Sequence, residues 1–315
     1  MRPEQIDLDG LLKRLHLPTV RRVYPELAAQ AEEEDMGHRD FLAVLIAEEV
    51  ANRGQTRIRR TVHRAGFPFL SMIEDFDFTF QTSIKQSLLG SFLGPELMSE
   101  GRNLILCGPA GVGKTHLAIA IAYRAIQNGS TAIFREANYL IEELSEASHE
   151  KRLRQAIEPY THTGVLVIDE IGYLTYPPDA ANVIFQVVNQ RHLARRPIVF
   201  TTNKPLAAWA DVLHDADLAE AIIDRVLERG RFIELRGTSY RTRHLNASTG
   251  AKSRRRKVTV SGKKGSEFPE PTLVKDSICS HRMSRCNASS SVANGAERSQ
   301  AMPLCVQRPF GASMP

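Results

Sequence analysis

The sequence lacks the features typical of a membrane protein, a disulfide-stapled protein or a structural metal site. No apolar run approaches the length of a membrane span, and the first residues contain no apolar signal-peptide core. The 4 cysteines show no C-x-x-C spacing, and no two histidines are spaced as metal ligands. We therefore expect a cytoplasmic protein without a membrane partner, a disulfide framework or a structural metal.

Positive charge is concentrated in one part of the chain. The 315 residues carry a formal net charge of +5. Residues 247–315 contain 12 Lys and Arg against 4 Asp and Glu, whereas residues 1–246 contain 29 against 32. The basic excess thus belongs to the end of the chain, so nucleic-acid binding elsewhere requires a local basic cluster.

The residue pattern predicts three segments. Residues 1–75 have apolar side chains at helical spacing, which predicts a small all-helical N-terminal domain for binding DNA or a partner. Residues 76–245 alternate short apolar strands with helices, which predicts an α/β domain with a parallel five-stranded sheet covered by helices on both faces. Residues 246–315 are basic and without periodicity, and we expect a disordered tail.

Five strands and five helices are expected in the α/β segment. The strands are predicted at Leu104–Cys107, Thr131–Phe134, Val165–Asp169, Ile198–Thr202 and Phe232–Leu235. The helices are predicted near residues 116–127, 137–145, 150–158, 179–193 and 216–229. In such a sheet the carboxyl ends of the strands carry the site.

The most specific motif is Gly108-Pro-Ala-Gly-Val-Gly-Lys-Thr115, a full match to the phosphate-binding loop G-x-x-x-x-G-K-[ST]. Its glycines permit backbone conformations that turn successive N–H groups inward, and the helix that follows favours an anion at its N-terminus. The motif predicts binding of a nucleoside triphosphate, with Lys114 on the phosphates and Thr115 on Mg²⁺. The expected binding residues are Gly108, Pro109, Ala110, Gly111, Val112, Gly113, Lys114, Thr115, His116 and Asp169.

Two acidic residues follow a second apolar run, Val165-Leu-Val-Ile168. Asp169 emerges at the end of the predicted strand, where it can hold Mg²⁺ directly or through water. Glu170 points in another direction and can orient or deprotonate an attacking water. The adjacent pair favours hydrolysis over simple nucleotide storage.

Further candidates lie downstream. Asn203 follows a predicted strand and can hydrogen-bond the γ-phosphate or the water. Without the two motifs above, polar capping of a strand end would be the preferred explanation. Arg225 can supply a guanidinium for transition-state charge, from a neighbouring subunit, whereas a surface ion pair is an alternative of similar weight. Three other arginines compete for that role: Arg229, Arg231 and Arg241.

A dense basic stretch ends the helical segment. Helical spacing places four arginines on one face: Arg53, Arg57, Arg60 and Arg64. Such a stripe suits the phosphate backbone of a nucleic acid, with sequence-tolerant and salt-sensitive binding. A solvated helix face whose arginines pair with Glu48 and Glu49 explains the same charges.

Together these motifs resemble the IstB-like group of AAA+ ATPases, the helper proteins of insertion-sequence transposition, which are related to the DnaC helicase loader. The resemblance covers residues 8–245 and is most restrictive in Lys114-Thr-His-Leu-Ala118 and Gly237-Thr-Ser-Tyr-Arg241. It implies an ATPase that converts ATP and water to ADP and phosphate. In that reading Lys114, Thr115, Asp169 and Glu170 form the core, Asn203 is the sensor and Arg225 is the arginine finger acting across a subunit interface.

The resemblance also implies partners. The protein would bind duplex DNA, form a homo-oligomer that depends on ATP and DNA, select target DNA and stimulate the transposase of the same element. Family members usually end soon after the Ser-Tyr-Arg sequence, so a frameshift or readthrough would account for residues 246–315. Two other hypotheses stay open: a DnaC-like loader of a replicative helicase, and a DNA-binding module that does not hydrolyse ATP.

Overall fold

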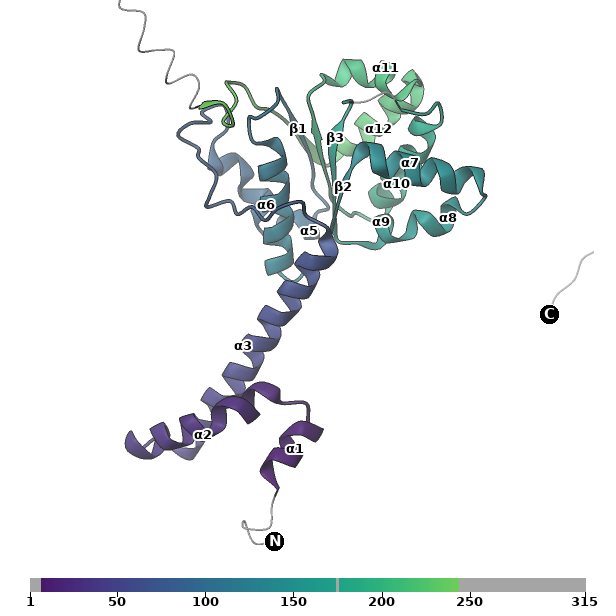
Figure 1. Cartoon of the computed structure of the whole chain (residues 1–315). Helices are drawn as coiled ribbons and strands as arrows, with labels where there is room; N and C mark the ends of the chain where they lie inside the picture. The colour runs from purple at the N-terminus through teal and green to yellow at the C-terminus, as the bar shows by residue number, and fades with distance from the viewer. Residues whose placement is uncertain (1–6, 174–175, 244–315) are drawn as a thin grey trace, which may run out of the picture. The chain divides into compact units, whose positions relative to one another are not determined.

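The computed structural model describes residues 7–173 and 176–243, so the predicted tail at 246–315 lies outside the described residues (Figure 1). The chain begins with three helices, α1 (Leu8–Arg14), α2 (Pro18–Glu33) and α3 (His38–Ala65). The predicted helical character of the N-terminal segment is therefore confirmed. No helix in the described part of the chain is both long and apolar enough to cross a membrane.

The three N-terminal helices share a small core, and a carboxylate fixes how α2 begins. Leu12, Val20 and Leu45 are buried together. The backbone N–H groups of Thr19 and Val20, in the first turn of α2, donate to Glu49 Oε2 of α3 at 2.9 and 3.1 Å. First-turn N–H groups have no partner within their own helix, so Glu49 satisfies two groups that would otherwise need water.

The second part of the chain is the predicted parallel sheet. Its strands are β1 (Asn103–Cys107), β2 (Ala132–Glu136), β3 (Val165–Ile171), β4 (Ile198–Thr202) and β5 (Gly230–Glu234), in the order β2-β3-β4-β1-β5. All four strand pairs are parallel; in register, Leu104 of β1 lies between Val199 of β4 and Arg231 of β5. The α/β fold class predicted from the alternating strands and helices is confirmed.

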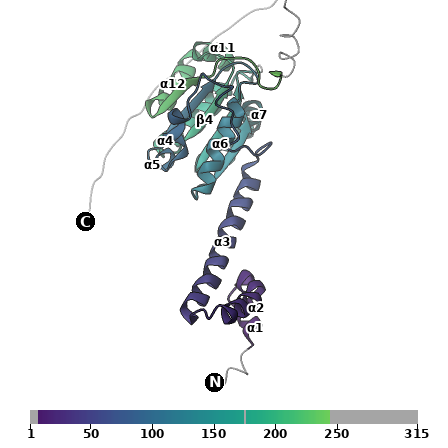
Figure 2. The same cartoon turned by 90° about the vertical axis from the view of Figure 1, so that its left-hand side faces the viewer.

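Helices cover both faces of the sheet, as Figures 1 and 2 show. One face packs against α6 (Lys114–Gln127), η2 (Gln86–Leu89), α4 (Gly90–Leu93) and α5 (Glu96–Ser99), together with the end of α3. The other packs against α7 (Ala137–His149), α8 (Leu153–Ala156), α9 (Glu158–His162), α10 (Ala180–Leu193), α11 (Trp209–Leu213) and α12 (Ala216–Glu228). A short η3 turn (Leu206–Ala208) precedes α11. Side chains in β1 alternate between the faces: Leu104 and Leu106 join the α6 side, and Ile105 the other.

Element bounds differ from the sequence prediction in two instructive places. The helix expected near residues 150–158 is two short helices, α8 and α9. Pro159 lies in the first turn of α9, where its missing N–H is tolerated, and so marks a new start rather than a continuation. The strand expected to end at Asp169 continues to Ile171, because β3 contains an irregularity that its apolar pattern does not reveal.

A buried arginine joins the starts of β3 and β4. Arg191 of α10 is fully buried and donates four hydrogen bonds of 2.6–3.0 Å to the carbonyls of Tyr160, Thr163, Gly164 and Pro197. Burial and the nearby Arg196 lower the pKa of Arg191 to about 9, which still leaves it charged at neutral pH. The four carbonyls replace the water that the guanidinium loses.

Replacing Arg191 by Met should lower the free energy of unfolding by about 3 kcal/mol, because four buried carbonyls lose their donor. Chemical denaturation of the full chain measures the change. Arg154→Met is the matched control, since Arg154 is exposed on α8, and it should change stability by no more than about 0.5 kcal/mol. Equal losses of unfolding free energy in the two variants would contradict a stabilising role for the hydrogen bonds of Arg191.

Replacing Glu49 by Ala should speed hydrogen exchange of the Thr19 and Val20 amides on the order of tenfold, because they lose their acceptor. Burial alone would raise the pKa of Glu49, but hydrogen bonds from Arg53, Val20 and Thr19 hold it below its ordinary 4.5. The stabilisation by the cap is therefore fully present above pH 4.5 and is lost as the pH falls through the lowered pKa of Glu49. Glu48→Ala, an exposed neighbour, should leave both amides protected.

Candidate functional site

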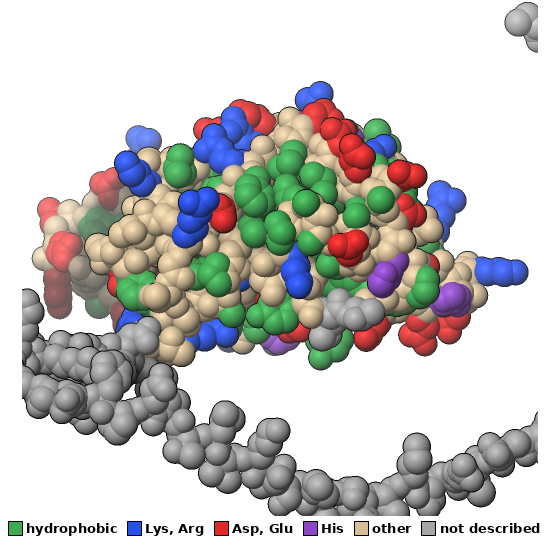
Figure 3. Space-filling view, turned by 90° about the horizontal axis from the view of Figure 1, so that it is seen from above, with side chains coloured by type: hydrophobic (Ala, Val, Ile, Leu, Met, Phe, Trp, Pro, Cys, Tyr) green, Lys and Arg blue, Asp and Glu red, His purple; other side chains and the backbone are tan. Residues whose placement is uncertain are grey.

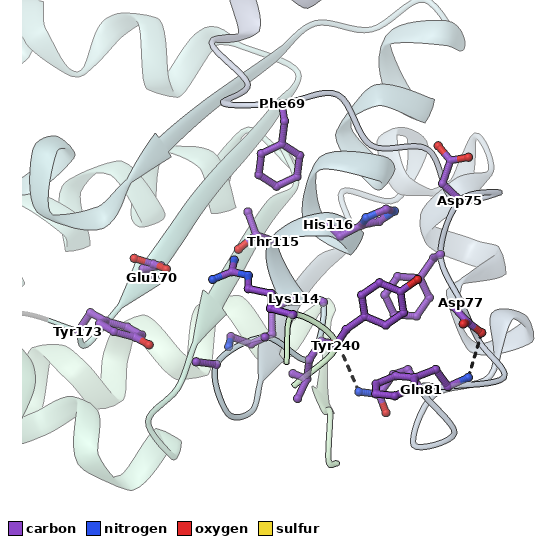
Figure 4. Close-up of a pocket in the computed structure, with 17 residues that line it drawn as sticks. Phe69, Asp75, Asp77, Gln81, Lys114, Thr115, His116, Glu170, Tyr173 and Tyr240 are labelled. Carbon is purple, nitrogen blue, oxygen red and sulfur yellow. Dashed lines mark hydrogen bonds between the residues drawn. The ribbon is translucent and has the colours of Figure 1, made fainter. Parts of the chain in front are cut away.

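The carboxyl ends of β1 and β3 border a cavity of about 250 Å³. The phosphate loop and Glu170 form one part of its lining. Tyr173 lies beside Glu170 in the lining. Two segments distant in sequence add further residues: Phe69, Phe76, Phe80, Gln81, Tyr240 and Arg241. Figure 4 shows Lys114 and Thr115 between Glu170 and Tyr173 on one side and His116, Tyr240 and Gln81 on the other.

The phosphate loop has the conformation that its glycines predict. Gly111 and Gly113 have φ values of +80° and +96°, in the region that favours glycine. A Cβ atom on Gly111 would lie 2.1 Å from Ser239 Oγ, and one on Gly113 would lie 2.6 Å from the Phe76 ring. The loop is thus held closely from two sides, and it leads directly into α6, whose first N–H groups are free to bind an anion.

The ammonium group of Lys114 lies inside the loop. Its Nζ donates to the carbonyls of Gly108 and Pro109 at 2.9 and 2.8 Å. Burial lowers the pKa of Lys114, while the charge of Asp169 acts in the opposite direction. A phosphate oxygen is a stronger acceptor than a neutral carbonyl, so these residues fit a triphosphate group.

Asp169 and Thr115 form an oxygen pair beside the loop. The Thr115 hydroxyl lies 3.1 and 3.0 Å from the two carboxylate oxygens of Asp169, which is 4% exposed. Burial raises the pKa of Asp169, against hydrogen bonds from Thr201 and Thr115 that lower it. A carboxylate and a hydroxyl are ligands that Mg²⁺ accepts, and water and phosphate oxygens normally complete its shell, so the pair fits Mg²⁺.

Glu170 lies at the irregular point of β3. Its backbone has a φ of +60°, and its side chain is exposed and lines the cavity. Partial burial of the carboxylate and the negative charges of Asp169 and Glu136 raise the pKa of Glu170. A higher pKa makes the carboxylate a better proton acceptor, which suits a residue that activates water.

The other two predicted catalytic residues lie outside the cavity lining. Asn203 is not among the residues that line the cavity. Its Oδ1 atom is buried and has no hydrogen-bond partner within the described part of the chain. Arg225 lies on α12, where its guanidinium donates to Asn189 Oδ1 and to the carbonyl of Ala221, both at 3.1 Å. It also lies 4.7 Å from the centroid of the Phe185 ring.

Arg241 is the competing arginine that the structure brings to the site. It lines the cavity of its own chain. Burial raises the pKa values of Asp169 and Glu170, and the positive charge of Arg241 opposes part of that rise. Its neighbour Tyr240 donates its backbone N–H to the Gly111 carbonyl at 2.9 Å. The end of the described chain is therefore fastened to the phosphate loop.

The segment between α3 and β1 is a part of the site that the sequence did not predict. Gln81 Nε2 donates to the Val112 carbonyl at 3.2 Å, and a ring nitrogen of His116 lies 2.9 Å from the Met72 carbonyl. Phe80 and Tyr240 meet edge to face with their ring centroids 5.2 Å apart. The repeated phenylalanines in Asp75-Phe-Asp-Phe-Thr-Phe80 were the available signal.

The predicted arginine stripe lines a separate groove of about 850 Å³ in the helical segment. The structure adds Lys13 of α1 and Arg21 of α2 to the cations of α3: Arg53, Arg57, Arg60 and Arg64. Arg53 pairs with Glu49 Oε1 at 2.8 Å and donates to the His16 carbonyl, so the pairing with Glu49 considered from the sequence is confirmed for this arginine.

The charge of this groove differs from that of another face of the molecule. Glu49 is the single acidic residue among those that line the groove. Figure 3 shows the molecule of Figure 1 from above. Hydrophobic side chains gather in the middle of this face, with acidic and basic side chains around them. Of these two surfaces, the groove is the one with the local basic excess that a nucleic acid requires.

Comparison with known proteins gives one family. The family model of the IstB-like ATP binding protein matches residues 10–248. A Pseudomonas aeruginosa protein named as the ATP-binding protein of insertion sequence IS21 is 34% identical over 235 residues, which cover 75% of this chain and 88% of that protein. The corresponding protein of IS5376 from Geobacillus stearothermophilus is 33% identical, over 73% of this chain and 91% of its own length.

The crystal structure of the DnaC helicase loader matches with a TM-score of 0.42 and 22% sequence identity, over 48% of this chain and 87% of that one. The strand order and the phosphate loop described above identify the fold class independently of this likeness.

Proposed function

The chain belongs to the IstB-like ATP-binding proteins, and on that premise we propose that it is an ATP-hydrolysing helper of DNA transposition. It binds ATP with Mg²⁺, assembles as a homo-oligomer on duplex DNA, and acts on the transposase encoded by the same element. The observation that carries the proposal is the meeting of Lys114, Thr115 and Glu170 at one cavity, with the buried Asp169 hydrogen-bonded to Thr115 beside it.

The residues of the cavity divide the chemistry between them. Lys114 exchanges its two carbonyl partners for phosphate oxygens, and the free N–H groups at the start of α6 bind the same phosphates. Thr115 and Asp169 are the residues that would hold Mg²⁺, which offsets phosphate charge when bound. Glu170 accepts a proton from the attacking water, and its raised pKa suits that role.

Three further residues complete the proposed machinery. The buried, unpartnered Oδ1 of Asn203 supports a role as a sensor that hydrogen-bonds water or phosphate once ATP is bound. Arg241 contributes positive charge within its own chain, since it lines the cavity. Arg225 is our candidate for the arginine that acts on a neighbouring subunit, because it is half-buried on α12 and not on its own cavity.

Two substitutions test the ATPase assignment. Lys114→Ala should weaken ATP binding by at least about tenfold, because the phosphates lose a charged partner. Glu170→Gln should bind ATP as well as the wild type but hydrolyse it at least about a hundredfold more slowly, because the proton acceptor is gone. Nucleotide affinity and phosphate release measure the two effects. If Glu170→Gln hydrolyses ATP at the wild-type rate, the enzymatic proposal fails.

The basic groove is the proposed DNA site. Cations from three helices face one concave surface, and polar side chains at Asn52, Thr56 and Thr61 lie among them. Contacts to phosphates from such residues give affinity without sequence preference. We assign the contacts to five cations: Lys13, Arg21, Arg57, Arg60 and Arg64. Arg53 is held by Glu49 and by the His16 carbonyl, so it joins the turn between α1 and α2 to α3 and adds positive charge to the groove.

Salt dependence tests this groove. Arg60→Ala should weaken binding of a labelled duplex and reduce the slope of log affinity against log salt by about 1, because one phosphate contact is lost. Fluorescence anisotropy over a salt series measures the slope. Arg59→Ala is the matched control, since Arg59 is exposed on the same helix but does not line the groove. Equal effects of the two variants would refute the groove as the binding surface.

The proposed transposase partner comes from the relatives. The proteins of Pseudomonas aeruginosa and Geobacillus stearothermophilus are both named for insertion sequences, and this chain covers 88% and 91% of their lengths. A helper encoded by such an element has the transposase of that element as its natural client. Binding and hydrolysis of ATP at the cavity would then determine when the protein is assembled on DNA.

A further inference from the structure

The Thr201 hydroxyl contacts both acidic residues of the nucleotide site. Thr201 is fully buried in β4, beside β3. Its Oγ1 donates to Asp169 Oδ1 and accepts the backbone N–H of Glu170 at 2.9 Å. We infer that Thr201 is a positioning residue that holds the Glu170 carboxylate in the orientation required to activate water. This inference rests on the ATP hydrolysis proposed above.

The pairing of β3 with β4 shows why Glu170 needs to be held. Ile168 pairs with Phe200, but the next pair joins Ile171 to Thr202. Three steps along β3 therefore match two steps along β4, so β3 contains one extra residue, a β-bulge. Bulges re-aim side chains and leave a backbone group without its usual ladder partner.

The extra residue changes which face each side chain of β3 occupies. Leu166 and Ile168 pack on the α10 side of the sheet, and Val167 packs on the α6 side. Strict alternation would send Ile171 to the α6 side, yet it packs with Ile168 on the α10 side. Asp169 occupies the α6 side that alternation gives it and meets Thr115 of α6, while the bulge lets Glu170, one residue on, reach the cavity.

This arrangement puts Glu170 in a conformation that requires support. A φ of +60° is unfavourable for a residue with a side chain, and such residues persist where surrounding contacts determine them. The Glu170 N–H finds its partner in the Thr201 hydroxyl at 2.9 Å. Because the same hydroxyl donates to Asp169, one atom fixes both the bulge and the neighbouring carboxylate.

The next residue of β4 provides a matched comparison. Thr202 is also fully buried, and its hydroxyl donates to the Ile171 carbonyl at 2.8 Å and accepts the Lys204 N–H at 3.0 Å. It has the same residue type and burial. Its hydroxyl also lies 3.3 Å from the Lys204 carbonyl, and none of its hydrogen bonds goes to Asp169 or Glu170. Loss of a buried hydroxyl can therefore be separated from loss of the hydroxyl that holds Glu170.

The test compares Thr201→Val, Thr201→Ser and Thr202→Val with the wild type in single-turnover ATP hydrolysis. Thr201→Val should reduce the hydrolysis rate about 10- to 100-fold, because Glu170 loses its fixed orientation. Its affinity for a fluorescent ATP analogue without Mg²⁺ should stay within about threefold of wild type, since the phosphate loop is untouched. Thr201→Ser keeps the hydroxyl and should restore most of the rate, and Thr202→Val should lose much less than Thr201→Val.

Two outcomes would overturn the inference: a wild-type rate in Thr201→Val, or a loss in Thr201→Ser or Thr202→Val as large as in Thr201→Val. If Thr201→Val does not fold, hydrogen exchange in the wild type tests the bond between the Glu170 N–H and the Thr201 hydroxyl. The Glu170 amide should be protected, and rapid exchange would refute that bond. Glu170→Gln in the same assay separates the two proposals. If the wild type is no faster than Glu170→Gln, ATP hydrolysis fails as the function, whereas the exchange result still tests the hydrogen bond.

Discussion

The nucleotide site depends on the hydrogen bonds that the buried carboxylate of Asp169 accepts. This carboxylate receives hydrogen bonds from Thr115 at the start of α6 and from Thr201 in β4, and thereby joins three elements at one point. A carboxylate at this depth costs free energy unless such donors surround it, and burial raises its pKa accordingly. A carboxylate that has lost its hydrating water also attracts a bound cation strongly. The buried position of Asp169 thus defines where the proposed Mg²⁺ would lie.

Much of the α/β fold follows from the sequence, because its signals are local. Apolar runs bounded by polar residues locate the five strands, and the carboxyl ends of parallel strands necessarily share one edge. Where prediction failed, the cause was also local but of another kind. The extra residue in β3 leaves the apolar pattern of Val165–Ile168 unchanged, and Pro159 divides a region whose helical spacing looks continuous.

The site could be predicted only where a motif carries it. The phosphate loop with Asp169 and Glu170 is recognisable from spacing. The structure brings the loop and Glu170 to one cavity and joins Asp169 to the loop through Thr115. The aromatic wall from Phe69 to Gln81, and Arg241, reach the cavity through contacts between segments far apart in the chain, which no periodicity reveals. The pairing of Arg53 with Glu49, four residues apart on α3, was by contrast within reach of the sequence. The hydrogen bonds of Glu49 to the start of α2 were not, because they join segments about 30 residues apart.

The two proposed sites are connected by one stretch of chain. Helix α3 carries the arginines of the groove, and the residues that follow it form the aromatic wall of the nucleotide cavity. DNA on the groove and ATP in the cavity are therefore expected to influence each other. The most direct measurement is the ATP turnover of the full chain with and without duplex DNA, in the wild type and in a variant with Arg57, Arg60 and Arg64 changed to Ala. Faster turnover with DNA in the wild type, and no such increase in the variant, is the predicted result; equal stimulation of both proteins, or of neither, would contradict the account.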